Sequence, residues 1–319
     1  MSEPLQEEFR FDSPLRGRTK SEKALMDFPF FALDKRGQRQ KPITFEEPDR
    51  NISIEVSAGQ HGMATIYDKD LILYVAGIMK EKLDRGEEPG RTFTFTVNDF
   101  MRVTNRPNNA DSYRRVHKML KRLRTTEIIT NIEYNGKGVD GAFSWLDSYK
   151  VQYKYDRPND PSHRRLQYYQ VQISEFLYNA ICSGHVLTYA DGYFDLAPLS
   201  RRIYDIARSM CGRQNGEVQI GLEKLQARTG YDGPLRRFKH ELRKIIERND
   251  LPEYNVKLRN DGEDRLFQQL KADGAVPPRH RKAELAKVLV VFWRKYPAAR
   301  THNEIRAELA HADLPRLPR

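Results

Sequence analysis

Hydrophobic and polar positions follow an ordered series of helix-like and strand-like segments through the first half of the chain. Residues 71–83 (LILYVAGIMKEKL) carry apolar side chains at helical spacing, and residues 91–97 (RTFTFTV) alternate as a strand does. A short helix at 98–105, a turn rich in Pro and Asn, and a longer helix at 113–127 follow, and the alternating segments 127–134 and 143–155 predict a hairpin around NGKGVDG. The order strand, helix, turn, helix, hairpin is typical of a winged helix-turn-helix.

The same order recurs in the second half. The predicted elements are a strand at 168–174, helices at 174–181 and 199–212, a strand at 217–220, helices at 222–230 and 235–248, and the start of a wing at 254–258. When the halves are aligned, Thr104 matches Thr229, and the pair Arg114 and Arg115 matches Arg236 and Arg237. We interpret this as a tandem duplication of one supersecondary unit.

The predicted fold class is therefore α+β, with two tandem winged helix-turn-helix domains and a helical C-terminal tail. The predicted boundaries are a disordered arm at 1–24, a first winged-helix domain at 25–160, a second at 161–270, and a helical C-terminal extension at 271–319. In the extension, an amphipathic helix is expected at 280–296 and a shorter one near 303–310. The apolar side chains of the first of these helices are expected to pack on the protein's own core: Leu285, Val288, Leu289, Phe292 and Trp293.

The longer helix of each half has one apolar face and one basic face. At 100° per residue the apolar sector of the second helix holds Leu235, Phe238, Leu242, Ile245 and Ile246, and that of the first holds Tyr113, Val116, Met119, Leu120 and Leu123. The cations on the other sides are Arg236, Arg237, Lys239, His240, Arg243 and Lys244 in the second helix, and Arg114, Arg115, Lys118, Lys121 and Arg122 in the first. Solvated faces usually interleave Glu with Lys. Because both faces are poor in acids, DNA binding is favoured over a merely solvated amphipathic helix.

Charge and position together give these cations roles. The formal net charge is +11, and cations placed on phosphates release condensed counterions. Arg236 and Arg237 stand in the first helical turn, from which a recognition helix reaches base edges in the major groove. His240 and Lys244 would meet either bases or phosphates. Lys257 and Arg259, on the second wing, would contact the backbone or the minor groove.

Several longer motifs resemble one known family. They are DFPFFAL at 27–33, HGMATIYDKD at 61–70, DSYRRVHKMLKRLRTTEI at 111–128, FSWLDSY at 143–149, LTYADGYFDL at 187–196, and LRRFKHELRKIIERNDLPEYNV at 235–256. From about residue 27 to residue 258 the chain resembles the plasmid replication initiator protein A family of Gram-negative bacteria. The resemblance implies an initiator that binds repeated sequences (iterons) at a plasmid origin, helps to melt an adjacent AT-rich segment, and recruits the host initiator ATPase and the replicative helicase.

The resemblance also implies a homodimer in equilibrium with a monomer. In similar tandem winged-helix initiators, the first domain serves dimerisation in one state and DNA binding in the other, while the second domain reads sequence. Carried over to this chain, Arg236, Arg237, His240, Arg243 and Lys244 lie on the reading helix. Arg114, Arg115, Lys118, Lys121 and Arg122 lie on the matching helix of the first domain.

Other classes of protein leave signals that this sequence lacks. It has no GxxxxGK[ST] phosphate loop, no HExxH and no pair of histidines flanking one apolar residue, so we expect no enzyme, no cofactor and no metal site. Only Cys182 and Cys211 are present, too few for a disulfide framework. No apolar run approaches the roughly 20 residues that span a bilayer, and the start is charged, so we expect a cytoplasmic protein without a membrane partner.

Two other functions remain open at this point. A transcription regulator could use the same two domains on an operator without any role in replication. A module that binds RNA or only other proteins is the third class, and competition with duplex RNA tests it because A-form grooves would not admit these helices.

Overall fold

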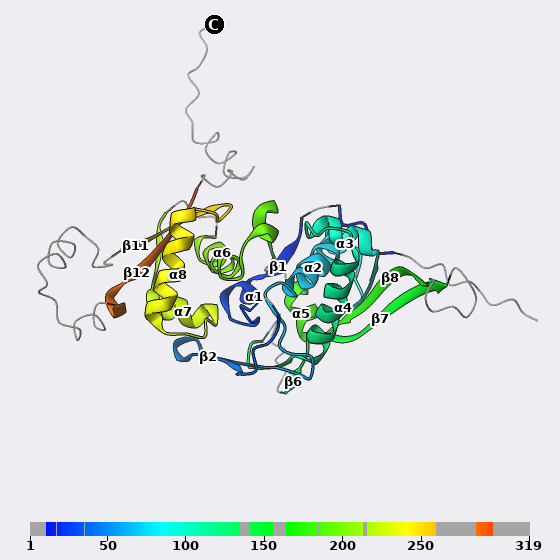
Figure 1. Cartoon of the computed structure of the whole chain (residues 1–319), viewed down its shortest axis with the longest axis horizontal. Helices are drawn as coiled ribbons and strands as arrows, with labels where there is room; N and C mark the ends of the chain where they lie inside the picture. The colour runs from blue at the N-terminus through cyan, green and yellow to red at the C-terminus, as the bar shows by residue number, and fades with distance from the viewer. Residues whose placement is uncertain are drawn as a thin grey trace, which may run out of the picture.

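The computed structural model describes residues 11–16, 18–34, 36–133, 141–155, 164–183, 186–212, 216–259 and 285–295. Two winged-helix units lie side by side, as Figure 1 shows: the first carries α2 to α5, β7 and β8, and the second carries α6 to α8, β11 and β12. Each unit has its own hydrophobic core. The shorter helix expected near 303–310 lies outside the described residues.

The first unit contains the predicted order of elements. Its helices are α2 (Lys69–Asp84), α3 (Val97–Val103) and α4 (Ala110–Thr125), and its strands are β4 (Thr92–Phe95), β7 (Leu146–Tyr155) and β8 (Arg164–Ile173). The three strands form an antiparallel sheet in the order β4-β8-β7, and β7 and β8 make the wing. The core contains an aromatic cluster in which Tyr74 contacts Phe95 and Phe100 edge-on.

Two details of the expected organisation are wrong. The strand expected to open the second domain is β8, and it pairs with β4 and β7 of the first unit. The helix that follows, α5 (Glu175–Cys182), buries Phe176 and Leu177 in the first core as well. The wing partner of residues 146–155 is therefore the segment after them along the chain, and the two strands pair over their whole length.

The segment expected to form the other half of the wing joins a separate sheet. The strands of this sheet are β2 (Ile43–Glu47), β3 (Ile52–Ser57), β5 (Glu127–Thr130) and β6 (Ala142–Phe143), in the order β2-β3-β5-β6. A short 3-10 helix, η1 (Pro48–Arg50), connects β2 to β3. Alternate residues of β2 and β3 are buried, as expected for strands with one face on a core: Ile43, Phe45, Ile54 and Val56.

The second unit repeats the pattern. Its helices are α6 (Pro198–Cys211), α7 (Leu222–Thr229) and α8 (Leu235–Arg248), and its strands are β10 (Val218–Gly221), β11 (Tyr254–Arg259) and β12 (Leu289–Arg294). The sheet order is β10-β12-β11. The aligned threonines have the same local role in both units: Thr104 and Thr229 are buried, and each hydroxyl donates to a carbonyl of the preceding turn, that of Phe100 or Gln226.

The amphipathic helix expected at 280–296 is wrong for residues 289–294, which form β12. Helical spacing and strand alternation overlap in such a short apolar run, and the β-branched residues Val290 and Val291 favour a strand. Pairing with both β10 and β11 completes the sheet of the second unit. Of the side chains expected to pack on the core, Val288 and Phe292 are buried in the second core and Leu285 packs against it, whereas Leu289 and Trp293 are only partly buried.

The N-terminal arm is ordered in its described part, so the disorder expected for residues 1–24 is wrong for residues 11–16 and 18–24. Leu15 is buried against Gly77 of α2, and its backbone N–H donates to Asp99 at 2.9 Å. The remaining small elements are β1 (Lys20–Glu22), α1 (Lys23–Asp27), β9 (Val186–Thr188) and the 3-10 helix η3 (Asp191–Asp195). Strand β1 pairs with β9, and α1 packs against α6, so the arm connects the two units.

Buried ion pairs join α2 of the first unit to α6 of the second. The Lys69 ammonium lies 2.7 Å from Asp205, and both side chains are fully buried. Asp70 accepts from Arg201 of α6 at 2.6 Å and from Arg106 at 2.8 Å. Leu73 of α2 also packs in the second core. Buried charges are tolerated only when paired, so these contacts fix the position of one unit on the other.

Candidate nucleic-acid interface

Helix α8 owes its position to a tight turn and a buried stripe. Gly230 ends α7 in the left-handed conformation (φ 70°), and Pro234 precedes the first residue of α8 with a backbone that suits a helix start. Phe238, Leu242 and Ile245 are buried in the second core, as the sequence predicted. The opposite side of α8 therefore faces away from the protein.

That outer face carries the expected cations. Arg236, Arg237 and His240 are exposed, and none of them makes a side-chain hydrogen bond or an ion pair within the described part of the chain. Lys244 pairs with Glu241 at 3.0 Å but remains 47% exposed. Lys239 and Arg243 are partly buried, and both have interaction partners. The first turn of α8 contains no acid, so its arginines are the least neutralised cations of this helix.

Helix α4 presents a similar face, but an acid pairs with an arginine in its first turn. Asn109 caps its N-terminus by accepting from the backbone N–H of Ser112 at 2.9 Å. Arg115, Lys118 and Lys121 are exposed as expected. Arg114 is exposed too, but it pairs with Asp111 in the first turn, and this contact lowers the pKa of the Asp111 carboxyl.

The prediction that Arg122 belongs to the exposed basic face is wrong. Its side chain is only 11% exposed, and its guanidinium donates two hydrogen bonds to Asp68, Nε to Oδ2 at 2.7 Å and Nη2 to Oδ1 at 2.6 Å. Burial alone would lower the pKa of Arg122, but the hydrogen bonds to Asp68 outweigh it and raise the pKa. A bidentate pair of this kind is a strong internal contact. Arg122 therefore holds α4 to the start of α2 and is not part of the free face.

The two wing cations are also engaged. Glu217, just before β10, accepts from Lys257 and from Arg259, the latter at 2.6 Å. The ammonium of Lys257 also lies 4.9 Å from the centre of the Trp293 ring. Both side chains remain partly accessible. Their charge is available to a duplex only in competition with Glu217.

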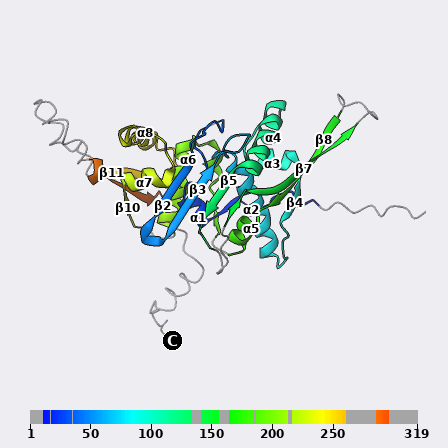
Figure 2. The same cartoon turned by 90° about the horizontal axis from the view of Figure 1, so that it is seen from below.

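Figure 2 shows α4 and α8 along the same side of the molecule, with the β7–β8 wing projecting beside α4. The strands of this first wing carry exposed Lys150 and Lys154, which sequence reasoning missed. The signal that could have revealed them is alternation in β7, where outward positions hold Lys, Gln and Lys. We call the exposed cations of these two helices and of this wing, taken together, the basic side.

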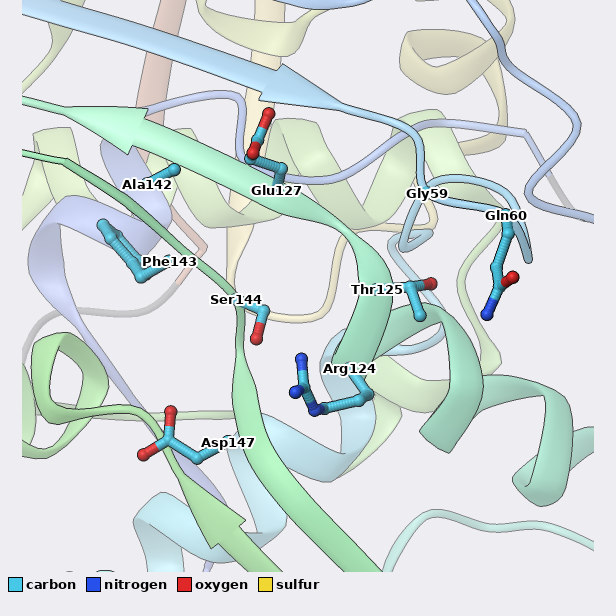
Figure 3. Close-up of a pocket in the computed structure, with 9 residues that line it drawn as sticks. All are labelled: Gly59, Gln60, Arg124, Thr125, Glu127, Ala142, Phe143, Ser144 and Asp147. Atoms are coloured by element: carbon cyan, nitrogen blue, oxygen red, sulfur yellow. The ribbon is translucent and has the colours of Figure 1, made fainter.

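One pocket opens between the end of α4 and the strands β5 and β6. Figure 3 shows the side chains of Arg124, Ser144 and Asp147 gathered around its opening. Asp147 pairs with Arg91 at 2.8 Å, and Glu127 adds a second carboxylate to the lining. Because its charges are mixed, the pocket does not extend the basic side.

In the described residues, no group of three His, Cys, Asp or Glu side chains could hold a metal ion, and no helix is long and apolar enough to cross a bilayer.

The fold defines the class of protein first: a tandem winged-helix protein with a basic helix exposed in each unit. Comparisons with known proteins then identify the family. The model of the replication initiator protein A family matches residues 20–256, and the chain belongs to this family. A protein described as a replication protein, from Wigglesworthia glossinidia brevipalpis, is 30% identical over 236 residues, which cover 73% of this chain and 82% of that one.

Solved structures of domains 2 and 3 of RctB share the fold. One superposes with a TM-score of 0.54 at 11% identity and covers 84% of this chain and 95% of the other. A second crystal structure of the same domains gives a TM-score of 0.50, also at 11% identity, and covers 83% of this chain and 94% of the other. At this identity the likeness concerns the fold.

Proposed function

We propose that this protein initiates plasmid DNA replication by binding repeated sequences at an origin, with α8 and α4 in major grooves of one duplex, and that it then recruits the host initiator ATPase and replicative helicase. The observation that carries the proposal is the pair of exposed, acid-poor helix faces on the same side of the molecule. Membership of the replication initiator protein A family supports the replication role.

The two helices are suited to different tasks. Arg236 and Arg237 are exposed in the first turn of α8 without internal partners, and an arginine in this position can donate to O6 and N7 of guanine. On α4, Arg115, Lys118 and Lys121 lie further along the helix, and Arg114 is tied to Asp111. We infer that α8 reads sequence, while α4 chiefly holds phosphates.

A rigid connection between the units favours a long repeated site. Lys69, Asp70, Arg201 and Asp205 fix α2 on α6, so the separation of α4 and α8 is set before DNA arrives. Engagement of one helix then raises the effective concentration of the other at its groove. If about eight phosphates are neutralised, log affinity should fall with log salt at a slope near −7.

A footprint of the purified full chain on the noncoding DNA beside its gene tests DNA binding. We expect protection at repeated segments, with major-groove contacts of each bound molecule on one side of the duplex. A footprint that shows no protection at any salt concentration would refute the proposal. Protection that duplex RNA removes as readily as DNA would favour the RNA-binding class.

Replication separates an initiator from a transcription regulator. A plasmid that carries the gene and the protected repeats, and no other origin, should be maintained in a suitable host. Loss of the plasmid while the protein is expressed and folded would leave the regulator as the better account. We further propose that the chain acts in the cytoplasm without enzymatic activity of its own, as a monomer on DNA in equilibrium with a homodimer.

A further inference from the structure

A basic loop contacts both winged-helix units. It runs from Asp34 to Pro42, and the structure describes residues 34 and 36–42 of it; we call it the bridging loop. At one end it contacts α4, and at the other it contacts the turn between α7 and α8. The proposed function assigns it no role.

The contact with α4 is made by Gly37. This residue has a φ of 69°, and a Cβ added to it would lie 2.5 Å from Cδ of Arg122 and 2.8 Å from the carbonyl oxygen of Met63. Any larger residue would have to displace either the backbone or the arginine that binds Asp68. The loop is therefore closely packed against α4 at Arg122.

The contact with the second unit is made by Arg39. Its guanidinium donates to the carbonyl of Gly230 at 2.9 Å and, within the loop, to the carbonyl oxygens of Lys41 and Pro42. Burial lowers the pKa of Arg39, as expected for a guanidinium that is partly desolvated by its own protein. Only one residue separates Gly37 from Arg39, so their Cα atoms lie within about 7 Å of each other. The bridging loop thus fills a narrow space between the supports of the two recognition helices.

Hydrogen bonds to Asp34 fix the backbone conformation of the bridging loop. The carboxylate of Asp34 accepts from four successive backbone N–H groups, those of Arg36 (2.7 Å), Gly37, Gln38 (3.2 Å) and Arg39 (3.1 Å). These bonds hold the backbone in a tight turn and use the negative charge of Asp34 internally. Arg36 is left on the outside: its side chain is exposed and makes no contact with a protein partner among the described residues. Lys41 is 74% exposed, and its ammonium lies 3.5 Å from Asp232.

We propose that the bridging loop is a third DNA contact, in which Arg36 and Lys41 bind phosphates along the minor groove between the major grooves occupied by α4 and α8. This inference rests on the proposed function. A duplex that meets both helices must pass over the loop that joins them, because the minor groove separates successive major-groove segments. Minor grooves attract arginine through their enhanced negative potential. Arg39 and Asp34 are positioning residues, since their side chains face the protein.

The test uses the full chain and two duplexes: the segment that the wild-type protein protects beside its gene, and a random sequence of the same length. For Arg36→Ala we expect affinity for both duplexes to fall about fivefold at low salt, and the slope of log affinity against log salt to shrink by about 0.9. Hydroxyl-radical protection should disappear from the minor groove between the two major-groove contacts. Adding Lys41→Ala should shrink the slope further.

The matched control is Arg85→Ala, which also removes one exposed cation. Arg85 follows the end of α2, and Figure 2 shows α2 on the side away from α4 and α8. We expect this variant to keep the wild-type slope and footprint. If Arg36→Ala behaves like Arg85→Ala, the bridging loop does not touch DNA, although the proposed function stands. A wild-type protein that protects no duplex refutes the proposed function itself, before any variant is made.

Asp34→Ala distinguishes loop geometry from simple charge. Removing an anion near DNA should tighten binding if only net charge matters. If the carboxylate orders the bridging loop, the same variant should instead lose protection in the intervening minor groove. Tighter binding with an unchanged footprint would overturn the architecture proposed for the loop. Thermal melting of each variant checks that it is folded.

Discussion

Helices α4 and α8 share a design but differ in where along the helix the protein neutralises their charge. On α8, the first turn holds Arg236 and Arg237 without an acid. On α4, Asp111 in the first turn pairs with Arg114, and Arg122 is committed to Asp68. A helix with bare arginines in its first turn can offer them to bases, whereas a helix whose arginines are partly paired keeps cations mainly for phosphates. The two helices thus differ chiefly in the acid of the first turn, which α4 has and α8 lacks.

The largest expected effect comes from breaking the buried α2–α6 contact, which sets the position of α4 relative to α8. Arg201→Ala removes one partner of Asp70 in a site where both side chains are buried, so we expect a loss of about 3–5 kcal/mol in the free energy of unfolding. Urea unfolding followed by circular dichroism measures it. Arg18→Ala is the control, because its pair with Asp191 is exposed and should contribute less than about 1 kcal/mol. Equal losses from both variants would mean that the α2–α6 contact is not a determinant of the arrangement.

The next effect concerns the helices themselves. Arg236→Ala with Arg237→Ala should abolish the preference for protected DNA over random DNA, at about 1–3 kcal/mol for each lost base contact. Arg114→Ala with Lys118→Ala should weaken binding to both DNAs alike, because phosphates carry no sequence. Competition binding at fixed salt gives the ratio of affinities for each pair of variants. Equal loss of discrimination from the two pairs would contradict the division of labour between α8 and α4.

The same comparison explains which features the sequence could predict. Helices α6 and α8 are long and strongly amphipathic, and the predicted ranges 199–212 and 235–248 match the structure to within a residue. The wings are harder to predict, because the local sequence of a strand does not determine which other strand it pairs with. The sequence predicts β8 in the second unit, although it pairs in the first, and it predicts a helix at β12 because this short apolar run fits both periods.

The site divides in the same way. Exposure of Arg236 and Arg237 follows from the helical wheel alone, since the opposite stripe must be buried. The burial of Arg122 does not follow from the helical wheel, because its partner Asp68 is 54 residues away in the sequence. The wheel places Arg122 on the outer side of an isolated helix, but in the protein Gly37 and Asp68 cover that position. The cations of the bridging loop had a signal in the run DKRGQRQK at 34–41, which follows an apolar cluster and surrounds a glycine.

A smaller effect is expected from the second wing. Lys257→Ala with Arg259→Ala should weaken binding to random DNA only severalfold, because Glu217 already competes for both cations. Glu217→Gln should act in the opposite direction by releasing both cations, and the effect should be small because exposed pairs of this kind are weak. The salt dependence of affinity, measured for both variants, checks the sign. A loss with Glu217→Gln would mean that this carboxylate orients the wing for DNA.

The smallest effect is expected from a substitution that removes the acid from the first turn of α4, so that this turn resembles that of α8. Asp111→Asn removes the acid that pairs with Arg114, so the arginine becomes free and affinity for random DNA should rise by about twofold, as expected for a weak exposed pair. The change also removes a negative charge that interacts favourably with the dipole of α4 at its N-terminal turn, so the melting temperature should fall slightly. Stronger binding together with a lower melting temperature would show that Asp111 trades DNA affinity for helix stability. Unchanged affinity would mean that Arg114 does not reach the duplex, and the phosphate contacts of α4 would then rest on Arg115, Lys118 and Lys121 alone.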